Sequence, residues 1–199
     1  MVEQLNMVYF PHREEWRAWL QANFEIEKEI WVVFPKKKSG LPAISYNDAV
    51  EEALCFGWID STIRSLDEDR KIQRFTPRRP QSTYSQPNIE RLKWLWEQGL
   101  IHSKITEKVA AIVQTPFVFP KDLMAVLQNE PEAWEHFEQF SEGYKRIRLA
   151  YIEDARTRPE EYQKRLSHFL SKTKAGKQIP GYGGIEKYYA RSSEAVSQE

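Results

Sequence analysis

The sequence has few residues that could form covalent cross-links or metal sites. It contains one cysteine, Cys55, and four histidines that stand far apart among its 199 residues. A lone cysteine cannot form an intramolecular disulfide, and scattered histidines do not make a metal-ligand motif. We therefore predict neither a disulfide framework nor a metal site.

The chain also has no net charge, because 29 Lys+Arg balance 29 Asp+Glu. No global field would draw the whole molecule to nucleic acid or to an anionic membrane. Any electrostatic function must therefore come from a local group of charges.

Long hydrophobic runs are absent as well. No uncharged stretch approaches the roughly 18 apolar residues of a membrane-spanning helix. The first ten residues, MVEQLNMVYF, include an acid and lack the basic start of a signal peptide. A reducing compartment is the default for such a chain, so we predict a cytoplasmic protein without a membrane span.

Common catalytic motifs are missing too. The sequence has no G-x-x-x-x-G-K-[ST] phosphate loop, no G-x-S-x-G nucleophile elbow and no H-E-x-x-H zinc motif. Their absence disfavours the common nucleotide hydrolases and zinc hydrolases. We expect no cofactor, and the sequence leaves open whether the protein is an enzyme.

The residues that are present predict a globular chain with β structure in its first half. Hydrophobic residues make up 41% of the chain, enough for a substantial core. Apolar spacing predicts a helix over 12–23, and EIWVVF predicts a buried strand over 29–34. Ser45 has the spacing of a helix cap, so a helix begins there and ends near Gly57. Residues 58–76 have the pattern of an antiparallel hairpin around the turn LDED.

From Ser85 onward the pattern changes to that of helices, which Pro116 and Pro120 interrupt. The predicted helices run from Ser85 to Gly99, from a cap at Ser103, over a short stretch before Pro131, and over 142–157 and 159–173. The resulting fold class is α+β, with a small antiparallel sheet and packed helices in the first half and a mainly helical second half.

We expect residues 1–100 to form an α+β portion and 101–175 a helical portion packed on it, together one compact domain. Residues 176–199 are turn-rich and end in the polar segment ARSSEAVSQE, which we expect to be mobile.

The most polarised segment of the first half is 70–89, which has five basic residues and no acid. Within it, TPRRPQSTYSQPN places two arginines beside several hydrogen-bonding side chains, just before a helix. The planar guanidinium group of arginine and the N-terminus of a helix both favour the binding of phosphate or carboxylate. The predicted ligand-binding residues are Trp58, Asp60, Arg78, Arg79, Ser82, Tyr84, Ser85 and Asn88. The alternative is that the prolines stiffen a surface crossover, Ser85 caps the helix, and the arginines pair with acids elsewhere.

Asp60 is a weak catalytic candidate. It follows the turn ALCFGW, in which a glycine permits a sharp change of direction. Asp60 could act as a general acid or base, or could hold Arg78 or Arg79. A structural role as a backbone or arginine partner is the simpler interpretation, as is a core position for Cys55.

A second concentration of charge lies in residues 143–177, with ten basic and four acidic residues, whereas 122–142 have six acids and no base. The two segments could face each other. Alternatively, Lys145, Arg148 and Lys164 could contact a protein partner. Direct binding of nucleic acid is disfavoured, because the chain has no RNA-binding aromatic signature, zinc finger or basic zipper.

Five segments resemble, in their order along the chain, the bacterial YdeI/OmpD-associated proteins, which are also labelled bacteriocin-protection proteins. These segments are W-x-x-W-L at 16–20, IWVVFPKKKSG, ISYNDAVEEALCFGWIDS, FTPRRPQSTYSQPN and YKRIRLAYIEDARTRPEEYQKRLSHFL, and the resemblance extends over residues 12–175. It implies a stress or bacteriocin-protection association without an established reaction, and residues 142–173 correspond to the region that carries the family name. Tyr84 stands where relatives commonly have tryptophan, and from Gly181 onward no family pattern is recognisable.

Three hypotheses of function follow. The first is a binding protein for a small anionic or phosphate-bearing ligand, held at the residues around Arg78 and Arg79. The second is a protein-interaction factor that acts through the basic helices at 142–173, and the third is an enzyme that uses Asp60 as acid or base. The chain could be a monomer or a homodimer, since its aromatic content does not require an interface.

Overall fold

The computed structural model describes residues 5–181 and 185–192. The chain divides into two compact units. Met1–Thr83 with Leu92–Ile112 form the first, named here the sheet unit, and Tyr84–Arg91 with Val113–Glu199 form the second, the helical unit.

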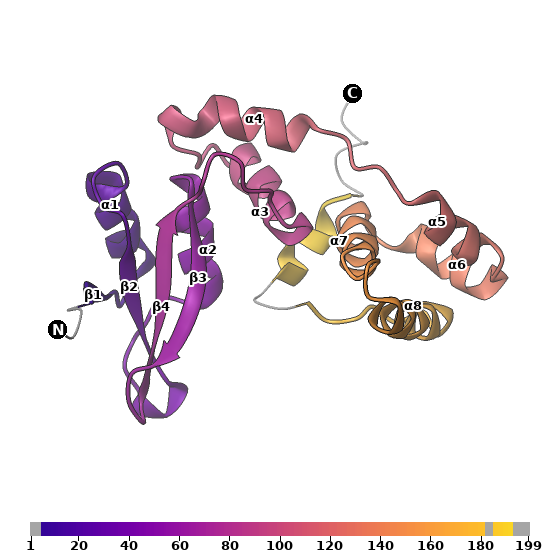
Figure 1. The fold of residues 1–199 in the computed structure, drawn as a ribbon, viewed down its shortest axis with the longest axis horizontal. Coiled ribbons are helices and arrows are strands. Elements are labelled where there is room, and N and C mark those ends of the chain that lie inside the picture. Colours follow the sequence, from indigo (N-terminus) through magenta and orange to yellow (C-terminus); the bar gives the residue numbers. More distant parts are fainter. Residues whose placement is uncertain (1–4, 182–184, 193–199) are drawn as a thin grey trace. The chain divides into compact units, whose positions relative to one another are not determined.

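The first half of the chain contains both strands and helices, whereas the second half contains only helices in the described residues (Figure 1). In the first half they are β1 (Met7–Tyr9), α1 (Arg13–Asn23), β2 (Ile30–Pro35), the 3₁₀ helix η1 (Lys37–Ser39), α2 (Tyr46–Cys55), β3 (Trp58–Ser65), β4 (Arg70–Pro77) and α3 (Gln86–Glu97). In the second half they are η2 (Ser103–Ile105), α4 (Thr106–Gln114), α5 (Lys121–Gln128), α6 (Pro131–Gln139), α7 (Glu142–Glu153), α8 (Pro159–Lys174) and η3 (Ile185–Ser192). The α+β fold class predicted from the sequence is confirmed.

The sheet has the strand order β1-β2-β4-β3. β3 and β4 form the predicted antiparallel hairpin, and β2 is antiparallel to β4. β1, however, is parallel to β2, with Met7 opposite Trp31. The prediction of a purely antiparallel sheet is therefore wrong at this edge. β1 has only three residues, too few to show a strand period, and α1 supplies the crossover that a parallel pair requires.

α1 and α2 pack together on the sheet (Figure 1). Trp16 of α1 is fully buried, its Nε1 donates to the carbonyl oxygen of Ala49 at 3.0 Å, and its ring lies 5.4 Å from that of Phe75 on β4. The Ser45 cap is confirmed, since its Oγ accepts from the amide of Asp48 at 3.0 Å.

A buried ionic network joins α1 to α2. Arg13 donates to Asp48 at 2.8 Å and to Glu51 at 3.0 Å and also contacts Glu52, which Arg17 reaches at 2.6 Å. The carboxylates of Glu51 and Glu52 are buried, so these two arginines neutralise charges that would otherwise be costly at this interface.

The end of α2 carries the lone cysteine. Cys55 is fully buried, and burial, followed by the nearby charge of Glu52, raises the pKa of its thiol to about 12. It is therefore a core residue rather than a thiolate nucleophile at neutral pH. Gly57 then adopts φ 73°, which allows the predicted turn from helix to strand.

The helical unit contains one helix that the sequence pattern did not predict. α6 begins at Pro131, where the sequence pattern indicates only the end of the preceding helix. Proline is equally compatible with a first helical turn, where its missing N–H costs nothing. α6 packs on α8 through the rings of Phe137 and Phe169, 6.3 Å apart. The predicted cap at Ser103 is also wrong, because the His102 ring accepts from the amide of Lys104 instead.

The segment predicted as a turn-rich tail contains η3, which packs on α7. Tyr188 and Tyr189 are buried, and the Tyr189 ring lies 5.1 Å from that of Tyr144. Most of the polar end expected to be mobile, from residue 193 onward, lies outside the described residues.

Candidate functional site

The residues predicted to bind a ligand are divided between the two units. Trp58, Asp60, Arg78, Arg79 and Ser82 belong to the sheet unit, whereas Tyr84, Ser85 and Asn88 belong to the helical unit.

Trp58 and Asp60 lie at the start of β3 and have partners in their own unit. Trp58 is only 1% exposed, and its Nε1 donates to the carbonyl oxygen of Phe24 at 3.0 Å, so it belongs to the core rather than to a ligand wall. Asp60 accepts from the hydroxyl of Tyr46 at 2.8 Å and from the amide of Gln73 at 3.1 Å. No ion pair joins Asp60 to either predicted arginine in the described part of the chain.

Arg78, Arg79 and Ser82 form a turn after β4. Nη2 of Arg78 donates to the carbonyl oxygen of Thr83 at 2.6 Å, and Oγ of Ser82 donates to that of Arg79 at 2.8 Å. Arg79 is exposed. Two of the predicted ligand donors thus hold the turn itself.

The remaining predicted residues belong to the beginning of α3. The carbonyl oxygen of Ser85 accepts from the amides of Asn88 and Ile89 at 2.9 and 3.0 Å, which starts the helix. Asn88 Oδ1 accepts from Nη1 of Arg91 at 3.0 Å, and Tyr84 is half-buried. These contacts give Ser85 and Asn88 a local structural role.

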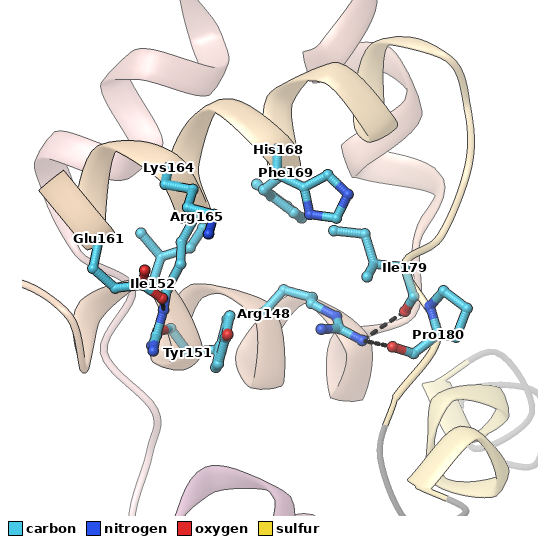
Figure 2. A pocket seen from close by; sticks show the side chains of 10 residues that line it. All are labelled: Arg148, Tyr151, Ile152, Glu161, Lys164, Arg165, His168, Phe169, Ile179 and Pro180. Carbon is cyan, nitrogen blue, oxygen red and sulfur yellow. Dashed lines mark hydrogen bonds and ion pairs between the residues drawn. The ribbon is translucent and has the colours of Figure 1, made fainter.

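A pocket of about 240 Å³ opens elsewhere, within the helical unit, between α7, α8 and the segment that follows α8. Figure 2 shows the side chains of α7 on one side of it and those of α8 on the other. The polar lining residues are Arg148, Tyr151, Glu161, Lys164, Arg165 and His168, and the apolar ones are Ile152, Phe169, Ile179 and Pro180.

Arg148 is the buried cation of this pocket. It is 7% exposed, and its Nη2 donates to the carbonyl oxygens of Ile179 and Pro180 at 2.6 and 2.8 Å (Figure 2). A third contact of 3.2 Å reaches the hydroxyl of Tyr189. All of these partners are neutral, and in the described residues no carboxylate pairs with Arg148 and no acceptor reaches its Nε.

Two phenol groups, those of Tyr144 and Tyr189, lie beside Arg148, and both have raised pKa values. Burial raises the pKa of Tyr189, and the positive charge of Arg148 opposes only part of that rise. Tyr144 behaves likewise, and its hydroxyl accepts from the amide of Ile179 at 2.9 Å. Both phenols stay neutral near pH 7 and cannot serve as the counter-ion of Arg148.

The other charges of the pocket lie on α8. Arg165 donates to Glu161 at 2.8 Å and stacks on the ring of Tyr151 at 3.8 Å from its centroid. Burial by itself lowers the pKa of Arg165, but Glu161, Tyr151 and Asp154 together outweigh burial and raise it. The hydrogen bond from Arg165 lowers the pKa of Glu161. Lys164 and His168 are exposed, and within the described ranges neither has a hydrogen bond or an ion pair.

The hypothesis of a protein-binding surface includes Arg148 and Lys164, but no hypothesis from the sequence includes Tyr151, His168, Ile179 or Pro180. Part of this site could have been predicted from the sequence, because basic and aromatic residues recur at helical spacing in 148–152 and 164–169. Residues 179 and 180 follow the helices in a stretch without periodicity, so no pattern could place them.

Membrane-spanning helices and metal-binding clusters are both absent from the described residues. Within residues 5–181 and 185–192 no helix combines the length and apolarity that crossing a bilayer requires. In the same ranges no three His, Cys, Asp or Glu side chains converge into a set that could hold a metal ion.

Two known family models match the chain. Residues 8–108 match a domain of unknown function, DUF8412, and residues 116–176 match the family described as Bacteriocin-protection, YdeI or OmpD-Associated. Because the first match covers just over half of the chain, this protein belongs to the DUF8412 family. No curated protein and no solved structure matches the chain.

The YdeI/OmpD-associated resemblance is confirmed over the helical part, although the sequence motifs had suggested that it begins at residue 12. The matched region includes α7 and α8, and therefore most of the pocket. Ile179 and Pro180, which accept the hydrogen bonds of Arg148, lie just beyond it.

Proposed function

We propose that the protein binds a small anion in the pocket between α7 and α8, with Arg148 as the buried cation. The observation that carries the proposal is the state of this side chain. Arg148 is more than nine-tenths buried, has only neutral partners among the described residues, and keeps a buried Nε without an acceptor.

Burial of an unneutralised charge is unfavourable, because the protein interior replaces only part of its hydration. The carbonyl oxygens of Ile179 and Pro180 satisfy one guanidinium nitrogen but do not cancel the charge. A carboxylate or phosphate oxygen would both neutralise Arg148 and accept from its remaining N–H groups. The pocket that Arg148 lines gives such an anion a place to bind.

The exposed charges that line the pocket support the same conclusion. Arg165 forms an ion pair with Glu161, whereas Lys164 is exposed and forms no salt bridge in the described part of the chain. Lys164 therefore adds positive charge beside the pocket, which would attract an anion and hold its outer oxygens.

The alternative of a broad basic surface for a protein partner is less well supported. Several basic residues in or next to α7 and α8 are paired with nearby acids. These pairs are Lys145–Glu142, Arg156–Asp122, Arg158–Asp154 and Lys174–Glu130. The excess of basic residues between 143 and 177 is thus largely compensated. As the biological setting we propose bacteriocin protection, which the description of the matching family names.

Isothermal titration of the protein with inorganic phosphate tests the proposal. The wild type should bind one equivalent saturably, and Lys164→Ala should weaken binding roughly three- to tenfold, the effect of one hydrogen bond of ordinary strength at an exposed side chain. Lys172→Ala is the matched control, because it removes an exposed lysine of the same helix that does not line the pocket, and it should leave the affinity within a factor of about two.

A third variant compares the two sites. Arg78→Ala/Arg79→Ala removes the arginines that the sequence favoured, and binding should survive it. Loss of phosphate binding in this variant but not in Lys164→Ala would overturn the proposal. So would a wild type that binds neither inorganic phosphate nor any organic phosphonate or carboxylate saturably.

A further inference from the structure

We infer that the ligand of this pocket is a small organic acid with a compact, flat apolar body, rather than a bare inorganic anion. The inference rests on the proposed function, because it names the class of anion that the same site would take. Its basis is the part of the pocket that Arg148 does not occupy.

The first observation is the apolar lining. Ile152 and Phe169 line the pocket and are each about 1% exposed. Ile179 is half-buried and Pro180 is exposed, so both present apolar surface beside the carbonyl groups that hold Arg148. An inorganic anion on Arg148 would leave this surface in contact with water, whereas an apolar body would cover it.

The second observation is the stacked pair at the other side of the pocket. The Arg165 guanidinium lies over the ring of Tyr151, which is itself 45% exposed. Figure 2 shows this pair across the pocket from Ile179 and Pro180. Planar groups of this kind pack well against another flat group, in offset-stacked or edge-to-face geometry.

The third observation is size. The volume of about 240 Å³ lies somewhat below the range of roughly 300–1,000 Å³ that is typical of pockets for drug-sized ligands. It therefore suits a single acid group on one small ring or a short chain. Phosphate and carboxylate share the chemistry that Arg148 recognises, namely an anionic oxygen that can accept from the N–H groups that do not donate to Ile179, Pro180 or Tyr189.

Calorimetric titrations with phenylphosphonate, methylphosphonate and benzoate test the inference. Phenylphosphonate should bind at least tenfold more tightly than methylphosphonate, because the ring removes apolar surface of ligand and pocket from water. Benzoate identifies the acid group: if it binds more tightly than phenylphosphonate, the natural ligand is a carboxylate, and if less tightly, a phosphate or phosphonate.

Two variants test whether the apolar lining of the pocket causes the preference for phenylphosphonate. Ile179→Ser should reduce the preference for phenylphosphonate over methylphosphonate to less than about threefold, while the affinity for methylphosphonate stays within a factor of two. The matched control is Val118→Ser, which changes an apolar residue of the same unit that is 82% exposed and does not line the pocket. It should leave both affinities unchanged.

The possible failures are distinguishable. Equal affinities for the two phosphonates, both weakened by Lys164→Ala, would overturn the ligand class and leave anion binding intact. No binding of any of the three acids or of inorganic phosphate would overturn both. Circular dichroism of each variant confirms that its helices are retained.

Discussion

A buried ion pair joins the first turns of α3 to α7, and its loss should be costly. Arg146 Nε and Nη2 donate to the two carboxylate oxygens of Glu90 at 2.7 and 2.8 Å. The Glu90 side chain is 5% exposed and that of Arg146 is 19% exposed. The hydrogen bond and charge of Glu90 raise the pKa of Arg146 against the opposing effect of burial. This pair fixes the first turns of α3 to the helix that carries Arg148.

Arg146→Met should destabilise the helical unit by about 3 kcal/mol. Removal of one partner of a buried pair typically costs about 3–5 kcal/mol, because the other charge stays buried. The lower end applies here, since Gln86 still donates to Glu90 at 2.8 Å. Where exchange proceeds through opening of this unit, 3 kcal/mol corresponds to a roughly hundredfold loss of protection for the amides of α7.

Hydrogen exchange of α7 peptides measures this loss separately from the sheet unit. Arg158→Met is the matched control, because its pair with Asp154 spans 3.6 Å and both side chains are more than half exposed. It should change protection less than about threefold. The double variant Glu90→Leu/Arg146→Met should recover most of the loss, since an apolar pair leaves no buried charge. If Arg146→Met loses no more protection than Arg158→Met, the reasoning is refuted.

Two further predictions concern a buried thiol and a close helix contact. Because burial raises the pKa of Cys55 to about 12, iodoacetamide at pH 9 should modify it slowly in the folded protein and rapidly in urea, and equal rates would contradict the assignment. The folded state keeps a thiol proton that the unfolded chain releases above its ordinary value of 9.0, so the unfolding free energy should decrease from about pH 9 towards pH 12, and Cys55→Ala should lack this component. Gly143→Ala would favour α7 by about 1 kcal/mol through helix propensity, but the added Cβ would lie 2.8 Å from the carbonyl oxygen of Tyr188. The net result should be a loss of about 1–3 kcal/mol in a denaturant titration, and an unchanged or higher stability would exclude the close packing of η3 on α7.

Local sequence signals were sufficient for much of the fold. The Ser45 cap, the turn at Gly57 and the β3–β4 hairpin each depend on residues that are neighbours in sequence, so their patterns predicted them. β1 was not predicted because three residues show no period, and its parallel pairing depends on a partner more than twenty residues away. α6 was missed because Pro131 can end one helix or begin another, and only packing decides which.

The candidate site was harder to predict because it depends on which charges find partners. Counting showed an excess of basic residues in 143–177 and of acids in 122–142, and ion pairs such as Arg156–Asp122 do join the two. The count could not show that Arg148 would be the residue buried without a carboxylate. Conversely, the composition of the TPRRPQSTYSQPN segment is typical of an anion-binding site. In the structure, however, Arg78 and Ser82 donate to carbonyl groups of their own turn.

The central claim is that an anion neutralises Arg148, and the Nε–H group of this side chain reports on it directly. In ¹H–¹⁵N spectra of the arginine Nε–H groups, Arg148→Lys identifies the Arg148 signal by its disappearance. Titration of the wild type with phenylphosphonate should shift this signal saturably, with the affinity measured by calorimetry, because its buried Nε has no acceptor among the described residues. If phenylphosphonate binds while the Arg148 signal stays in place, or if the signals of Arg78 and Arg79 move instead, the account is contradicted.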